Sequence, residues 1–95
     1  MDYVYVLEDA NGRLYVGRSS NLKQRIKQHA SGEVWTTRRM SEPKLIFYEA
    51  FRAKDDAIRR ERYFKTTKGK SSLRQIIRGS LTNQAGVAEW YTLAT

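Results

Sequence analysis

The chain has 95 residues, the size of one small domain, and carries 18 Lys and Arg residues against 10 Asp and Glu residues. The resulting formal net charge of +8 favours a polyanionic partner such as nucleic acid. The chain contains no cysteine, which excludes disulfides, thiolate metal sites and thiol nucleophiles and fits a reducing cytoplasm. No apolar run approaches the roughly 18 residues of a membrane span, and strand-like sequence begins at once, so we expect a cytoplasmic protein with no signal peptide and no membrane partner.

Two segments near the N-terminus alternate between apolar and polar residues and predict a β-hairpin, residues 3–8 and 14–17. Their aliphatic residues share one face only if even-numbered residues pair with even-numbered ones, so the loop must hold an odd number of residues. A loop of three or five residues with Gly12 in the left-handed conformation meets this condition, whereas a two-residue turn does not. The same register places Tyr5 and Tyr15 together on the other face.

A short helix is expected from about Leu22 to Ala30, because residues 19–21 offer side chains that can cap its first turn and Ser31-Gly32 can end it. Arg25 and His29 lie four residues apart and therefore stack at the edge of its inward stripe. A histidine beside an apolar stripe is more often a hydrogen-bonded core residue than a reactive one, and both interpretations stay open here.

The rest of the chain predicts one more strand and two more helices. The near-continuous apolar run at residues 44–51 indicates a central strand covered on both faces. Asp55 and Asp56 open a second helix, a basic break follows at residues 66–70, and a third short helix ends at Gly79. We therefore divide the chain into a domain at residues 1–79 and a tail at residues 80–95, whose late aromatic residues leave it open whether the tail packs on the domain.

Glu61 projects from the inward stripe of the second helix, because Ala57 precedes it by four residues and Phe64 follows it by three. A carboxylate in such a position needs a partner, and either an arginine or a metal ion would serve.

Together these side chains supply each group that phosphodiester cleavage needs. A tyrosine can act as the base for water if nearby cations acidify its phenol. Arg25 can bind a phosphate through two hydrogen bonds, and Glu61 can bind one magnesium ion, which usually keeps several of its waters. Taken singly, Tyr5 and Tyr15 would be read as cross-strand packing residues and Arg25 as a solvated helix residue.

In order and spacing, the set resembles the GIY-YIG nuclease family, and it looks close to the small single-domain bacterial-type branch. The residues that carry the resemblance are Tyr3-Val4-Tyr5, Tyr15-Val16-Gly17, Arg18, Arg25, His29 and Glu61. The resemblance covers about Tyr3 to Ile77. It implies an α/β sandwich in which helices flank a three-stranded antiparallel sheet, in the order β-β-α-β-α-α.

The resemblance also implies roles. The catalytic residues would be Tyr5, Tyr15, Arg25, His29 and Glu61, and the substrate-binding residues Gly17 and Arg18, to which we add the basic loop residues Arg38 and Arg39. We favour Tyr5 as the base, with Tyr15 hydrogen-bonded to the water or the phosphate. Arg25 would bind the scissile phosphate, and Glu61 would bind a single Mg²⁺ or Mn²⁺ ion.

Three functions compete. The first is a divalent-metal-dependent endonuclease that hydrolyses DNA, structured or single-stranded, in repair or processing. The second is a nucleic-acid-binding module whose catalysis is lost or depends on a partner, because Leu73 stands where many family members have an asparagine and Asn83 lies too far along to replace it. The third, a structural or protein-interaction role, would require the reactive set to be a coincidence.

Overall fold

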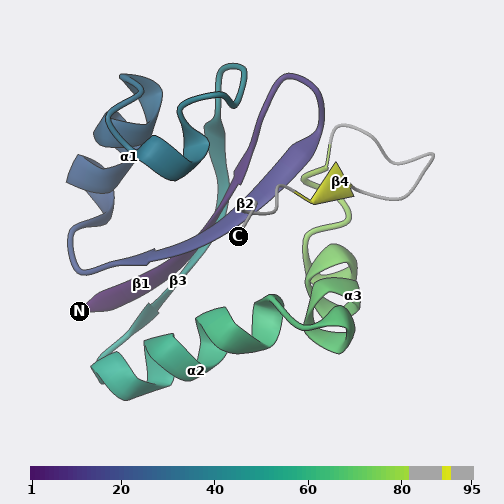
Figure 1. Cartoon of the computed structure of the whole chain (residues 1–95). Coiled ribbons are helices and arrows are strands. Elements are labelled where there is room, and N and C mark those ends of the chain that lie inside the picture. The colour runs from purple at the N-terminus through teal and green to yellow at the C-terminus, as the bar shows by residue number, and fades with distance from the viewer. Residues whose placement is uncertain (82–88, 91–95) are drawn as a thin grey trace.

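The computed structural model describes residues 1–81 and 89–90, whose strands form one sheet in the order β3-β1-β2-β4. The elements are β1 (Asp2–Glu8), β2 (Arg13–Ser19), α1 (Leu22–Ala30), the 3₁₀ helix η1 (Trp35–Thr37), β3 (Lys44–Phe51), α2 (Lys54–Phe64), α3 (Thr67–Ile76) and the two-residue β4 (Glu89–Trp90). Figure 1 shows α1 on one side of the sheet and α2 and α3 on the other. The three antiparallel strands and three helices confirm the predicted β-β-α-β-α-α sandwich. None of the helices described could cross a bilayer.

The hairpin of β1 and β2 has the predicted register. Val6 pairs with Val16 and Tyr5 pairs with Gly17, so odd-numbered residues face odd-numbered ones. Three residues close the loop between Asp9 and Arg13, with Gly12 at φ 80°. The buried Asp9 carboxylate stabilises the loop by accepting hydrogen bonds from the backbone N–H groups of Asn11 and Arg13, at 3.0 and 2.9 Å.

The main core lies between the sheet and the α2–α3 pair. The aliphatic face of the hairpin packs there against buried residues of the helices and of the segment after them, and the cluster comprises Val4, Val6, Leu14, Val16, Ala57, Phe64, Leu73, Ile77 and Leu81. Burying this apolar surface is the principal favourable term in folding. The opposite face of the hairpin, with its tyrosines, is left to α1, and this separation places polar chemistry on the α1 side.

Two predictions about the elements are wrong. β3 lies at an edge of the sheet, whereas β1 pairs on both sides and is fully buried from Val4 to Leu7. The basic break at residues 66–70 is helical, because α3 begins at Thr67. Thr66 caps it, accepting a hydrogen bond from the Gly69 N–H at 3.0 Å, while the lysine at 68 stays exposed and does not disturb the helix.

Part of the predicted tail adds to the sheet, since β4 pairs in parallel with β2 beside Arg13 and Leu14. Residues 82–88 and 91–95, which include Asn83 and Tyr91, lie outside the described residues. The boundary at residue 79 stays a prediction.

The junction of α2 and α3 depends on Gly69. A Cβ atom there would overlap the backbone carbonyl oxygen of Tyr63, which cannot move without shifting α2. We expect Gly69→Ala to destabilise the protein by about 1–3 kcal/mol, although alanine is the better helix former. Gly79→Ala is the control, because its Cβ would meet nothing within 4 Å. Equal unfolding midpoints for the two variants in urea, followed by circular dichroism, would contradict this account of the junction.

Candidate active site

Three rings meet on the α1 side of the hairpin. Tyr5 of β1 and Tyr15 of β2 have ring centroids 6.4 Å apart, and the His29 ring of α1 lies 5.5 Å from each. The Tyr5 hydroxyl is hydrogen-bonded to His29 Nε2 at 2.7 Å. The register that groups the valines thus also brings both tyrosines to one helix.

Gly17 makes room for this arrangement. It sits directly opposite Tyr5 in the sheet. A Cβ atom at this position would lie 2.5 Å from Tyr5 Cζ and Oη and 2.9 Å from Tyr15 Cε2. Any other residue would therefore displace the two rings. The groups that approach Gly17 closely are thus the two tyrosine rings.

Thr37 of η1 completes the surroundings of His29. Its Oγ1 lies 2.5 Å from His29 Nδ1, so both ring nitrogens are hydrogen-bonded. Tyr5, His29 and Thr37 are each at most 2% exposed. Thr37 is not among the site residues predicted from the sequence. The available signal was His29 itself, because a histidine on an inward stripe needs a partner at each nitrogen.

Burial sets the protonation of this Tyr5–His29–Thr37 chain. Desolvation, reinforced by Arg25, lowers the pKa of His29 to about 4, so the imidazole is neutral at neutral pH. Desolvation, with added repulsion from Tyr15, raises the pKa of Tyr5 well above its ordinary value, and Arg25 only partly opposes this. The expectation that cations would acidify the phenol is not met at Tyr5 in the resting protein, because burial outweighs Arg25.

Glu61 lies on α2, in the other layer of the sandwich. Its charge is among those that act on Tyr5, and its side chain is 22% exposed. Glu61 Oε1 lies 3.6 Å from Arg18 Nε, and Oε2 accepts a hydrogen bond from Lys65 at 3.1 Å. We expected either an arginine or a metal ion as the partner of this carboxylate. In the structure its partners are two cationic side chains, Arg18 and Lys65.

The four arginines singled out from the sequence differ in their surroundings. Arg25 is partly buried and forms no ion pair within residues 1–81, although its charge acts on both Tyr5 and His29. Arg18 is shared between Glu61 and Asp2, the latter at 3.7 Å. Arg38 stacks over the Trp35 ring at 5.2 Å, and Arg39 is exposed. Neither Arg38 nor Arg39 has a hydrogen bond, ion pair or ring contact with the tyrosine pair in the described part of the chain.

A metal ion bound here would have Glu61 as its protein ligand. The described residues contain no group of three or more His, Asp or Glu side chains that could enclose an ion. A partly exposed single carboxylate nevertheless fits Mg²⁺, which keeps several waters and binds proteins through one or two carboxylates. Leu73, at the position of the family's asparagine, is fully buried in the core and offers no ligand.

Comparisons with known proteins identify the family to which the chain belongs. The model of the GIY-YIG catalytic domain matches residues 1–75. A UPF0213 protein of Streptococcus agalactiae is 41% identical over 64 residues, covering 66% of this chain and 73% of that protein. Another, from Pediococcus acidilactici, is 36% identical over 77 residues, covering 78% and 79%. The solution NMR structure of a UPF0213 protein from Bacillus halodurans has a TM-score of 0.51 at 35% identity, covering 80% of this chain and 85% of that one.

The chain therefore belongs to the GIY-YIG family of nucleases. Its relatives within that family are the small bacterial UPF0213 proteins, whose names assign them no activity.

The lowered pKa of His29 predicts how stability depends on pH. Between pH 6.5 and about 4 the unfolded chain protonates His29 while the folded protein does not, so stability falls as pH falls through this window. The full loss is about 3 kcal/mol. The His29→Gln variant has no imidazole to titrate. Its free energy of unfolding, measured in urea across this pH window, should therefore fall by about 3 kcal/mol less than that of the wild-type protein. Parallel curves for the two proteins would contradict the burial of a neutral imidazole.

Proposed function

We propose that the protein is a divalent-metal-dependent endonuclease that hydrolyses phosphodiester bonds in DNA. The observation that supports this most is the buried hydrogen bond from Tyr5 to a neutral His29, with Arg25 and Glu61 close enough for both charges to act on the phenol. A packing tyrosine needs no such surroundings. Hydrolysis needs a proton acceptor, a cation for the phosphate and a ligand for a metal ion, and these residues can supply all three.

The proton acceptor in this proposal is the Tyr5–His29 pair. As a water oxygen attacks phosphorus, the Tyr5 oxygen takes the water's proton and its own proton passes to His29 Nε2, 2.7 Å away. The phosphorus–oxygen bond to the leaving strand then breaks. A phenol with a raised pKa is a poor base alone, so transfer to neutral His29 makes the step feasible. Nε2 can accept only if the ring's proton is on Nδ1, where it donates to Thr37 Oγ1.

The remaining residues hold the substrate. Arg25, which has no ion-pair partner among residues 1–81, binds the scissile phosphate, and Tyr15 hydrogen-bonds to the water or a phosphate oxygen. Glu61 would hold one Mg²⁺ or Mn²⁺ ion in place of its ion pair with Lys65, which is exposed and therefore contributes little. When bound, that ion would neutralise charge that develops on the phosphate and the leaving oxygen.

The substrate class follows from charge. A net charge of +8 on a small domain favours the phosphate backbone, and the partner we propose is DNA, structured or single-stranded, in repair or processing within the cytoplasm. Gly17, Arg18, Arg38 and Arg39 remain our candidates for contacts with the strand.

A second candidate is a nucleic-acid-binding module whose catalysis is lost or depends on a partner. The observation that favours it is Leu73, since a fully buried leucine cannot replace the family's asparagine. This function predicts salt-sensitive DNA binding without a metal-dependent product.

Cleavage of single-stranded, bulged and branched DNA tests the main proposal. The wild-type protein should release product with Mg²⁺ and none with EDTA. Glu61→Gln and Arg25→Ala should each cut at least about 100-fold more slowly, because Arg25 would stabilise the negative charge of the transition state and Glu61 would hold the metal ion that does the same. Glu42→Gln, which changes an exposed loop carboxylate, should behave as wild type. Equal cleavage by all the variants would reveal a contaminating nuclease and contradict the proposal.

Thr37→Val tests the proton path, because valine keeps the shape of threonine but removes the oxygen that faces His29 Nδ1. We expect the single-turnover cleavage rate to fall about 10–100-fold, the usual effect of losing the group that orients a reactive histidine. Thr37→Ser should restore most of the rate. Melting temperatures serve as a control for folding, and full activity in a folded Thr37→Val protein would exclude a role for this hydroxyl.

A further inference from the structure

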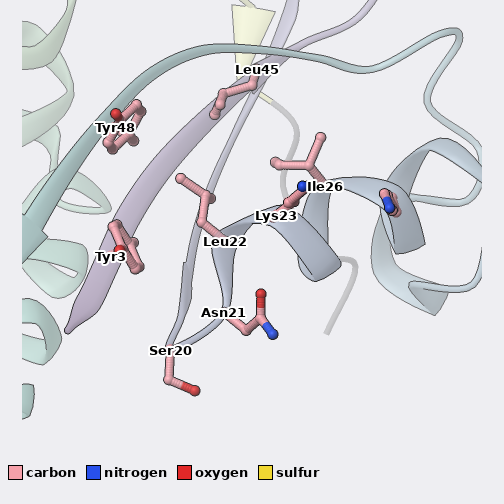
Figure 2. A pocket seen from close by; sticks show the side chains of 9 residues that line it. Tyr3, Ser20, Asn21, Leu22, Lys23, Ile26, Leu45 and Tyr48 are labelled. Atoms are coloured by element: carbon pink, nitrogen blue, oxygen red, sulfur yellow. The ribbon is translucent and has the colours of Figure 1, made fainter.

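A hollow of about 660 Å³ lies between the strands β1 and β3 and the first turns of α1. It is lined by Tyr3, Ser20, Asn21, Leu22, Lys23, Ile26, Lys27, Leu45 and Tyr48. Figure 2 shows the rings of Tyr3 and Tyr48 on the strand side, with Leu22 and Ile26 of α1 across from them. Its walls are therefore aromatic on one side and aliphatic on the other.

The hollow adjoins the candidate active site. Tyr3 precedes Tyr5 by two residues on β1, so both side chains lie on the same face of the sheet. Tyr48 of β3 pairs directly with Tyr5. On α1, Ile26 follows Arg25, the residue that we propose binds the scissile phosphate. A strand held at Arg25 would therefore pass this opening with a neighbouring nucleotide.

The chemistry of the lining suits a nucleotide. Tyr48 is 53% exposed, and Tyr3 supports its ring edge-on at a centroid distance of 6.1 Å, so a flat surface is presented to solvent. Lys23 and Lys27 are exposed, and none of the described residues that line the hollow is a carboxylate. An apolar segment of a protein partner would pack against the walls of the hollow, but it would leave Lys23 and Lys27 without a counter-charge.

We propose that this hollow receives one unstacked nucleobase from the nucleotide next to the scissile phosphate. Tyr48 stacks on the base, Leu22 packs on its other side, and Lys23 and Lys27 contact the backbone phosphates. The volume falls within the range of about 300–1,000 Å³ that is usual for small-molecule sites. The inference rests on the proposed nuclease function and deepens it by naming a substrate class, DNA with an unpaired base. Such a base enters the hollow without the cost of leaving a duplex.

The test is a binding cycle in EDTA, so that no cleavage is needed. The full chain is titrated with a duplex that carries one bulged adenine, the same duplex with an abasic bulge, and the fully paired duplex. We expect Tyr48→Ala to bind the adenine bulge about tenfold more weakly and to leave the affinity for the abasic bulge unchanged. Tyr48→Phe keeps the ring, and Ile76→Ala removes an equally exposed apolar residue from α3. Both should bind the adenine bulge as wild type does.

The inference is overturned if Tyr48→Ala binds the adenine bulge as tightly as wild type, if the loss is the same for the abasic bulge, or if no DNA is bound. The first two results are separate from the fate of the proposed activity, whereas the absence of any DNA binding would count against both proposals. Cleavage with magnesium that is indifferent to Tyr48 would leave the nuclease proposal intact, and the expected binding cycle without any product would remove the nuclease proposal alone.

Discussion

The hydrogen bond from the Tyr5 hydroxyl to His29 Nε2 is the contact on which the rest of the α1 side depends. Both partners are almost fully buried, so breaking the bond would leave a polar group unsatisfied inside the protein, at greater cost than the bond itself contributes. The bond fixes α1 over the hairpin. It also accounts for the residue types at two neighbouring positions. Gly17 leaves space for the phenol ring, and Thr37 is hydrogen-bonded to the second nitrogen of His29.

The main apolar core lies on one side of the sheet and the Tyr5–His29 hydrogen bond on the other, which lets a small domain hold such a site. A chain of this length has a modest core, and the α2–α3 side supplies it with aliphatic residues from both layers. The α1 side can then bury a tyrosine and a histidine in hydrogen-bonded form. The two charged groups that we propose act with the phenol come from different elements, Arg25 from α1 and Glu61 from α2.

What could be predicted from the sequence follows from local periodicity. The hairpin register could be predicted from the alternation of apolar and polar residues, because only one parity of pairing groups the valines on one face. The same parity places Tyr5 and Tyr15 together on the other face. The bounds of α1 came from its capping residues, and Asn21 does accept a hydrogen bond from the Gln24 N–H. The family resemblance supplied the candidate residues, and the structure shows that Tyr5, Tyr15 and His29 form one cluster.

The rest depends on the path of the chain through space. β3 has the more continuous apolar run, but β1 is the central strand and its Tyr5 is buried against His29 of α1, which its own alternation does not show. Thr37 reads as an ordinary loop residue until η1 folds back on α1. The charge of Arg25 suggested an acidified phenol, but burial of Tyr5 proved to be the larger effect.

The protonation of His29 is the most direct test, because the proposed proton path requires a neutral ring with its proton on Nδ1. Long-range ¹H–¹⁵N correlation spectra of the histidine, the only one in the chain, can identify its tautomer and charge. The account predicts a neutral Nδ1–H ring at neutral pH that stays neutral well below its ordinary pKa of 6.5. A charged ring at neutral pH, or a neutral ring with its proton on Nε2, would contradict it.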